Sequence, residues 1–153
     1  MEKAYFAAGC FWHTQEDFDK VRGVVSTSVG YSGGKTPSPS YEQVCSKNTG
    51  HAETIEIEFD EKRISYADLL KKFFSIHDPV QKDGQGADIG SNYRSAIFFV
   101  GDKQKKYALD AVKSEERRWG KKVATEVKEL KTFYPASEYH QKYYLKHAKV
   151  CGV

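Results

Sequence analysis

Cysteine, methionine and long apolar runs are all scarce in this sequence. The 153 residues include one methionine and three cysteines, Cys10, Cys45 and Cys151. An odd number of widely spaced cysteines argues against a secreted disulfide scaffold, and it argues against a zinc site, which needs paired ligands. We therefore expect no metal centre, and reactive thiols are the chemistry left for these residues.

Membrane signals and a surplus of one charge are also missing. No apolar run reaches the length of a bilayer span, and the N-terminus has no basic stretch followed by an apolar one. Lysine and arginine exceed aspartate and glutamate by only 24 − 21 = 3, with both signs alternating along the chain. Since no basic stripe forms, we expect neither a nucleic-acid partner nor a membrane partner. The expectation is a soluble, cytoplasmic monomer.

What the sequence does contain is aromatic residues and mixed periodicity. Its length suits one domain over residues 1–153 that buries its own core. Ten tyrosines and nine phenylalanines would give any apolar pocket rigid walls. Segments of strand period and helix period follow one another in irregular order, which predicts an α+β domain with a mixed, mostly antiparallel sheet and helices packed on it.

Hydrophobic spacing and turn residues predict where the elements lie. The histidine that ends the second helix, His77, is expected to be a satisfied core or cap residue. Residues 33–39 and 81–92 are rich in glycine, proline or polar residues and are expected to be loops that carry function. Strands are predicted over 3–8, 24–31, 51–59, 96–100 and 123–127, and helices over 10–21, 66–77, 103–119 and from 133 onward.

The run Gly9-Cys10-Phe11-Trp12 is the first candidate site. It places a cysteine in the first turn of a predicted helix, where unpaired N–H groups and the helix dipole stabilise a thiolate. The two aromatic side chains that follow would form an apolar wall beside the sulfur. The alternative is a buried, inert cysteine that acts as a small hydrophobe.

Glu53 is the second candidate. In the strand 51–59, Ile55, Ile57 and Phe59 share one face, and Glu53 has the same parity. A carboxyl group on the core-facing side is costly to ionise, so its pKa should rise and it could donate a proton at neutral pH. The alternative is a structural ion pair with a lysine or arginine elsewhere in the chain.

Four segments stand in order along the chain: Gly9-Cys10-Phe11-Trp12, Gly50-His51-Ala52-Glu53, the run Asp88-Ile89-Gly90-Ser91-Asn92-Tyr93-Arg94-Ser95, and Tyr134-Pro135-Ala136 leading to Tyr139-His140-Gln141. Together they resemble the A-type peptide methionine sulfoxide reductases, and the similarity runs from about Tyr5 to Cys151. The resemblance implies a two-layer α+β roll with a ferredoxin-like core and long loops, and we expect a mobile C-terminal tail over about 146–153.

The activity that this resemblance implies is reduction of the S epimer of methionine sulfoxide, free or in oxidised proteins, as a repair reaction. It needs no metal or organic cofactor, and thioredoxin, or dithiothreitol in vitro, supplies the electrons. A sulfoxide needs a soft nucleophile, a proton donor and hydrogen bonds to its oxygen. Cys10, Glu53 and the hydroxyls of Tyr41 and Tyr93 match those needs. By resemblance, Phe11 and Trp12 hold the substrate methyl group and Asp88 polarises the site.

Attack would leave a sulfenic acid on Cys10, which a second thiol condenses with to form a disulfide. We predict that Cys151 is this resolving thiol, because a terminal segment has few restraints, and that Cys45 is an inert packed thiol. Two departures from the family pattern stand out. His13 follows Trp12 where many members have a small residue, typically glycine, and the tail has one cysteine where some members have two.

Two other functions fit parts of the pattern. A Cys-His hydrolase would use Cys10 as nucleophile and His51, His140 or His13 as base, and it requires a histidine beside the sulfur. A noncatalytic module would use the aromatic pocket to bind apolar side chains and would need no reactive thiol.

Overall fold

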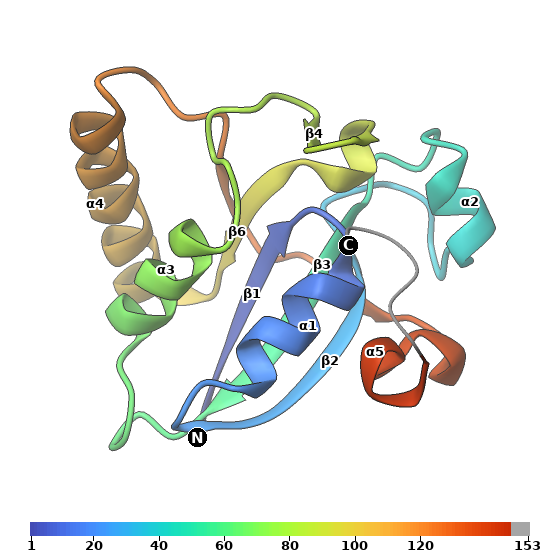
Figure 1. Cartoon of the computed structure of the whole chain (residues 1–153), viewed down its shortest axis with the longest axis horizontal. Helices are drawn as coiled ribbons and strands as arrows, with labels where there is room; N and C mark the ends of the chain where they lie inside the picture. The colour runs from blue at the N-terminus through green and yellow to red at the C-terminus, as the bar shows by residue number, and fades with distance from the viewer. Residues whose placement is uncertain (148–153) are drawn as a thin grey trace.

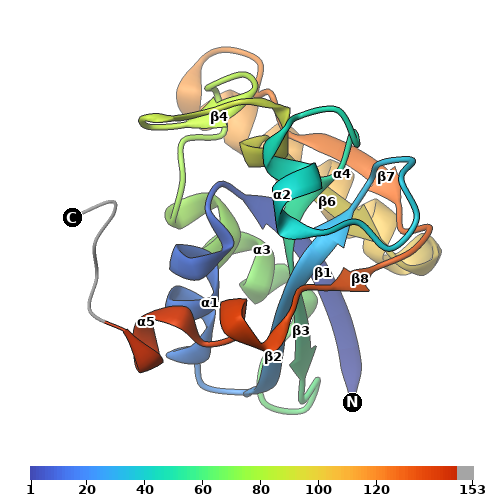
Figure 2. The same ribbon diagram turned by 90° about the vertical axis from the view of Figure 1, so that its right-hand side faces the viewer.

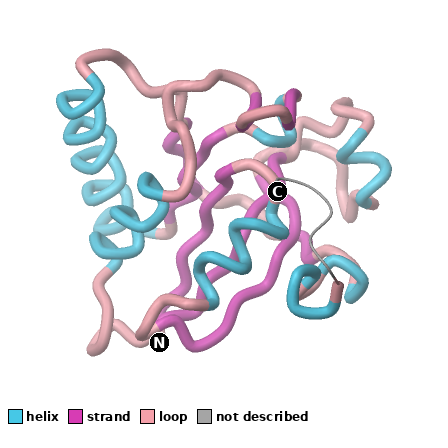
Figure 3. Tube along the Cα trace, viewed as in Figure 1, coloured by secondary structure: helices cyan, strands magenta, loops and turns pink. Residues whose placement is uncertain are grey.

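A six-stranded sheet in the order β7-β6-β1-β3-β2-β8 forms the centre of the computed structural model, which describes residues 1–147. Neighbouring strands are antiparallel except β6 and β7, which run parallel. The predicted α+β class with a mixed, mostly antiparallel sheet is confirmed (Figure 3). The strands are β1 (Glu2–Ala8), β2 (Val24–Ser32), β3 (Ala52–Phe59), β6 (Ser95–Phe99), β7 (Glu126–Glu129) and β8 (Tyr134–Pro135).

The first part of the chain forms a ferredoxin-like unit. Its order is β1, α1 (Phe11–Asp19), β2, β3, α3 (Tyr66–Ser75) and β6, and in space these strands follow one another as β6-β1-β3-β2. Figure 1 shows α1 and α3 lying on the same side of the sheet, with α4 (Gly101–Trp119) beside α3. The ferredoxin-like core implied by the resemblance is thus present.

Alternation along the strands decides which side chains form the core. Ile55, Ile57 and Phe59 of β3 are fully buried under the helices, whereas Glu56 and Glu58 on the other face are half-exposed. At the start of α3, Ser65 and Asp68 form a reciprocal capping box, as the serine predicted. The helix-covered face of the sheet therefore holds the main hydrophobic core, and Glu53 lies on that face.

Several loops contain short elements that periodicity did not reveal. Residues 41–45 form a one-turn helix, α2 (Tyr41–Cys45), and the expected loop over 81–92 contains a hairpin of β4 (Gly84–Gln85) and β5 (Asp88–Ile89) followed by the 3₁₀ turn η1 (Ser91–Tyr93). The strand expected at 123–127 lies at β7 instead. The first helix begins at Phe11, so Cys10 is its N-cap residue rather than part of its first turn.

The prediction of one aromatic-rich helix from residue 133 is wrong. Tyr134 and Pro135 extend the sheet as β8, because a residue before proline is driven to extended backbone and proline interrupts a helix. The chain then forms the 3₁₀ turn η2 (Glu138–His140) and the short helix α5 (Tyr143–Lys146). Figure 2 shows this segment crossing beside β2 and α1. Most of the expected tail, including Cys151, lies outside the described residues.

Candidate active site

Cys10 lies where β1 ends and α1 begins. The preceding residue, Gly9, has φ +96°, and a Cβ there would come within 2.8 Å of the Cβ of Gln85, so the turn requires glycine. The carbonyl of Cys10 accepts hydrogen bonds from the N–H groups of His13 and Thr14 at 3.2 and 3.3 Å. The half-buried thiol therefore stands at the positive end of α1, where a thiolate is stabilised.

Glu53 is buried beside this turn, with only 2% of its surface exposed. Its Oε1 accepts a hydrogen bond from the backbone N–H of Phe11 at 3.1 Å, and its Oε2 has no hydrogen-bond partner among the described residues. Burial raises the pKa of Glu53 to about 8, the nearby charge of Asp88 adds to the rise, and the Phe11 N–H opposes it. Since Oε1 is an acceptor, the acid proton of the neutral form belongs on Oε2.

The alternative role for Glu53, a structural ion pair, does not fit the described part of the chain. No lysine or arginine within residues 1–147 forms a salt bridge with this carboxyl group. A buried carboxyl without a cation is held neutral up to an unusually high pH, which is the property of a proton donor.

Two tyrosine hydroxyls lie around Glu53. Tyr41 comes from α2 and Tyr93 from η1, and for both the pKa is raised above its ordinary value, mainly by burial and next by the charge of Glu53. Both hydroxyls therefore stay protonated and can donate hydrogen bonds. The charges of Asp88 and Cys10 also act on Tyr93. Segments far apart in the sequence thus bring the predicted thiol, acid and hydroxyls to one place.

Phe11 and Trp12, the residues expected to form an aromatic wall, belong to a larger cluster of aromatic rings. Phe11 is buried with its ring centroid 5.7 Å from that of Tyr31. Trp12 is half-exposed and stacks on Tyr143, with the ring centroids 3.7 Å apart and an interplanar angle of 7°. Tyr31 and Tyr143 were not predicted as site residues. Tyr31 has the parity of the buried Val29 along β2, which is the signal that could have indicated a buried hydroxyl.

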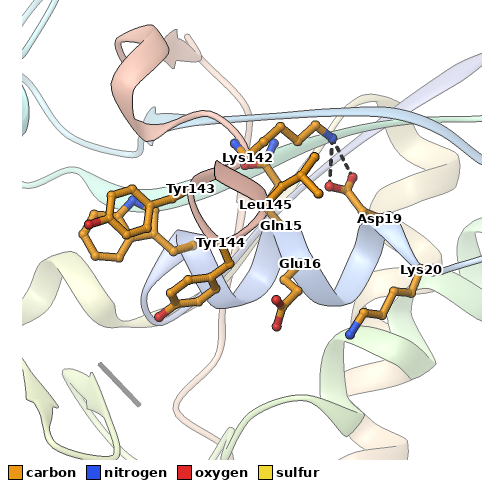
Figure 4. A pocket seen from close by; sticks show the side chains of 9 residues that line it. Gln15, Glu16, Asp19, Lys20, Lys142, Tyr143, Tyr144 and Leu145 are labelled. Atoms are coloured by element: carbon orange, nitrogen blue, oxygen red, sulfur yellow. Dashed lines mark hydrogen bonds and ion pairs between the residues drawn. The ribbon is translucent and has the colours of Figure 1, made fainter. Parts of the chain in front are cut away.

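The segment that bears Tyr143 is fastened to α1. Figure 4 shows Lys142 reaching over Asp19, with its Nζ 2.8 Å from both carboxylate oxygens. The backbone N–H of Lys142 also donates to Oε1 of Gln15 at 2.7 Å. Between α1 and α5 these residues border a pocket of about 280 Å³ that reaches Trp12 and Tyr143.

The histidines proposed as bases for a hydrolase have other partners. His51 accepts from the N–H of Gly34 through Nδ1 at 3.0 Å, so its Nε2 carries the proton and donates to the carbonyl of Thr36 at 2.7 Å. Both ring nitrogens therefore hold the 33–39 loop. The Nδ1 of His140 accepts a hydrogen bond from the indole Nε1 of Trp12 at 3.3 Å, and its ring stacks on that of Tyr41 with the centroids 4.2 Å apart.

Two further histidines, His13 and His77, also have structural contacts. The Nε2 of His13 lies 3.1 Å from the hydroxyl of Tyr144. His77 interacts with the carbonyl of Phe73 at 2.7 Å and with the hydroxyl of Ser95 at 2.8 Å, and burial lowers its pKa to about 4. The expectation that His77 is a satisfied core or cap residue is confirmed.

Cys45 lies closer to the site than its expected role as an inert packed thiol suggests. It ends α2, its thiol interacts with the hydroxyl of Tyr41, and burial raises its pKa, with Glu53 adding to the rise. A raised pKa leaves less thiolate at neutral pH, which lowers its reactivity. Within residues 1–147 no cluster of three or more histidine, cysteine, aspartate or glutamate residues could hold a metal ion. No helix in that range is long and apolar enough to cross a membrane.

This fold and site define a class: α+β proteins of ferredoxin-like core that set a cysteine at a helix start beside a neutral, buried carboxyl group and tyrosine hydroxyls. The sequence pattern of one such family, "Peptide methionine sulfoxide reductase", matches residues 2–152. The chain belongs to this family of oxidoreductases.

Relatives and solved structures agree with this assignment. A protein of Sulfolobus acidocaldarius named "Peptide methionine sulfoxide reductase MsrA" is 50% identical over 147 residues, which cover 96% of this chain and 84% of that protein. The crystal structure of Mxr1 from Saccharomyces cerevisiae in reduced form is 35% identical, with a TM-score of 0.93 over 99% of this chain and 89% of that one. Mxr1 in complex with Trx2 is 26% identical, with a TM-score of 0.67 over 93% and 84% of the two chains.

Proposed function

We propose that this chain reduces the S epimer of methionine sulfoxide, free and in oxidised proteins, to methionine. The observation that carries the proposal is the buried carboxyl of Glu53, whose Oε1 accepts the N–H of the residue that follows Cys10 at 3.1 Å. That bond holds the carboxyl group in place near the thiol, and burial keeps the group neutral. A soft nucleophile and a proton donor in one site suit a sulfoxide, whose sulfur is a poor electrophile until its oxygen is protonated.

The reaction then balances as an oxygen transfer. The thiolate of Cys10 attacks the sulfoxide sulfur while Oε2 of Glu53 gives its proton to the sulfoxide oxygen. The oxygen then moves from the substrate sulfur to the sulfur of Cys10, so the sulfur–oxygen bond of the substrate and the transient bond between the two sulfur atoms both break. Cys10 is left as a sulfenic acid, and the substrate sulfur has gained two electrons and leaves as methionine. Tyr41 and Tyr93 donate hydrogen bonds to the oxygen as its negative charge grows, and Asp88 polarises the site.

Substrate recognition rests on the aromatic wall. Phe11 and Trp12 hold the methyl group of the substrate, an apolar group that gains by leaving water. The stack of Trp12 on Tyr143 and its bond to His140 hold the indole ring in place. The exposed rim of the site allows either a free amino acid or a peptide to enter, because Cys10 and Trp12 are only half-buried.

The oxidised enzyme is recycled through a second thiol. Cys151 attacks the sulfenic acid on Cys10, a disulfide forms and water leaves, and a thioredoxin reduces the disulfide. The complex of Mxr1 with Trx2 supports a thioredoxin as the reductant. No organic cofactor or metal is needed for these steps. We infer that the protein works in the cytoplasm as a monomer, without membrane or nucleic-acid partners.

Consumption of each methionine sulfoxide epimer with dithiothreitol as reductant tests the proposal. We expect turnover of the S epimer alone, and a Cys10 sulfenic acid that dimedone traps after a single treatment with substrate. Turnover of a chromogenic thioester without sulfoxide reduction would indicate the Cys-His hydrolase instead. Binding of apolar side chains with no reaction at Cys10 would indicate a noncatalytic module.

A further inference from the structure

Two buried polar groups on the helix-covered face of the sheet have no hydrogen-bond partner within residues 1–147. One is Oε2 of Glu53 and the other is the hydroxyl of Tyr31, in residues that are only 2% and 1% exposed. A buried polar atom without a partner is costly, so each such group in a folded protein calls for an explanation.

The two groups belong to directly opposed residues. Tyr31 of β2 pairs with Glu53 of β3 in the antiparallel register, so their side chains leave the sheet on the same face. Phe11 contacts both, because its N–H binds Glu53 and its ring lies 5.7 Å from that of Tyr31. The charge of Glu53 also adds to the rise in the pKa of Tyr31 that burial causes. The hydroxyl therefore stays protonated beside the carboxyl group.

A recess that Tyr31 lines in part opens to the surface. It has a volume of about 210 Å³ and lies between the start of α2 and the segment 135–140. Exposed Ser40, Glu42 and Ser137 form part of its wall, and buried Tyr31 and His140 form its inner side. A water molecule takes about 30 Å³ in the liquid, so the recess has room for several.

We propose that Tyr31 is a positioning residue for Glu53: its hydroxyl holds a water molecule, drawn from this recess, against Oε2 of the carboxyl group. The inference rests on the proposed role of Glu53 as proton donor. Once Glu53 has given up its proton, the tyrosine donates to the water and the water donates to the carboxylate. The same water returns a proton from solvent to Oε2 before the next reaction.

A hydrogen bond of this kind favours the ionised form, since donors bind a carboxylate more strongly than a neutral acid. Removing the hydroxyl should therefore move the titration of Glu53 to higher pH. The other groups that face Glu53 or Tyr31 stay in place in such a variant, so a difference from wild type isolates the hydroxyl. They are Asp88 of β5, Tyr93 of η1, and Tyr41, Glu42 and Cys45 of α2.

Tyr66 provides a matched control. Its hydroxyl is also buried without a partner among the described residues, and burial is the only cause that raises its pKa. Tyr66→Phe thus removes the same atom from the same hydrophobic core, away from Glu53. Tyr31→Phe keeps the ring that contacts Phe11.

The experiment measures single-turnover methionine formation between about pH 6 and pH 10, a range that brackets the raised pKa of Glu53, about 8. The rate of wild type and Tyr66→Phe should fall as Glu53 ionises, with the same midpoint. Tyr31→Phe should shift that midpoint upward by about one pH unit, the scale expected for one hydrogen bond to a charged group. A midpoint equal to that of Tyr66→Phe, or below it, would overturn the proposal.

Glu53→Gln separates this inference from the proposed function. If Glu53→Gln keeps the wild-type rate, the role of Glu53 itself is wrong and the inference falls with it. If the rate of Glu53→Gln no longer falls at high pH while Tyr31→Phe has the wild-type midpoint, only the inference is wrong. An infrared titration measures the same midpoint without an activity assay. It follows the band of the protonated carboxyl group that is absent in Glu53→Gln, and it decides the case if Tyr31→Phe reacts too slowly to assay.

Discussion

The carboxyl group of Glu53 and the backbone N–H of Phe11 are joined by a hydrogen bond of 3.1 Å. Phe11 is the first residue of α1 and follows Cys10, so one bond links the end of β1, the start of α1 and the face of β3. The bond occupies Oε1 and leaves the acid proton for Oε2. The bond therefore fixes the side chain of Glu53 against the backbone of the residue that follows Cys10.

Glu53→Gln tests the acid role. The amide keeps an oxygen that can accept from Phe11 but has no acidic proton, so we expect the sulfoxide step to slow by about 10²- to 10⁴-fold, the usual scale for lost acid catalysis. Single-turnover methionine release at neutral pH measures this step. A variant that folds normally and reacts at the wild-type rate would contradict the assignment.

Cys10→Ser should abolish reduction of methionine sulfoxide, because a hydroxyl at neutral pH is a far weaker nucleophile toward sulfur than a thiolate. Cys45→Ser is the matched control, since it replaces the other described thiol near Glu53. It should retain most of the wild-type rate with dithiothreitol. Wild-type turnover by Cys10→Ser would show that the nucleophile lies elsewhere.

Cys151→Ser should separate the first step from recycling. We expect it to release one methionine per enzyme at normal speed and then stall with thioredoxin as the only reductant, while small thiols restore turnover. Peptide mapping of wild type after one turnover provides the direct check. A bridge between Cys10 and Cys45, with none between Cys10 and Cys151, would assign the resolving role to Cys45.

Glu53 should also make the folded protein less stable as pH rises. Its folded pKa of about 8 lies above the ordinary 4.5, so between these values the folded state binds more protons than the unfolded state. Stability therefore falls across this window, by on the order of a few kcal/mol for one strongly shifted group. In denaturant unfolding, the free energy of unfolding of Glu53→Gln should rise relative to that of wild type as pH increases.

Glu58→Gln is the control for that measurement, because Glu58 lies on the opposite, half-exposed face of the same strand. Its stability relative to wild type should change little over the same pH range. An equal pH dependence in both variants would show that the loss comes from general charge repulsion rather than from the buried carboxyl group.

Local sequence patterns predicted the parts of the site that depend on neighbouring residues. The glycine before Cys10 indicated a tight turn, and Gly9 has the left-handed backbone that such a turn requires. Parity along one strand placed Glu53 on the buried face, as found. Patterns failed where Pro135 and a left-handed Lys142 interrupt the C-terminal segment, since three short elements replace one helix.

The sequence by itself determined the alternation of strands and helices, the turn that sets Cys10 at a helix start and the face of the strand on which Glu53 lies, because each follows from hydrogen bonds and side-chain directions within a few residues. Only the tertiary structure decided that Tyr31 faces Glu53, that His140 binds Trp12 and that Tyr143 covers its ring. Those contacts join segments far apart in the chain. The raised pKa of Glu53 is also a result of the tertiary structure, since the burial that causes it is a property of everything that surrounds the group.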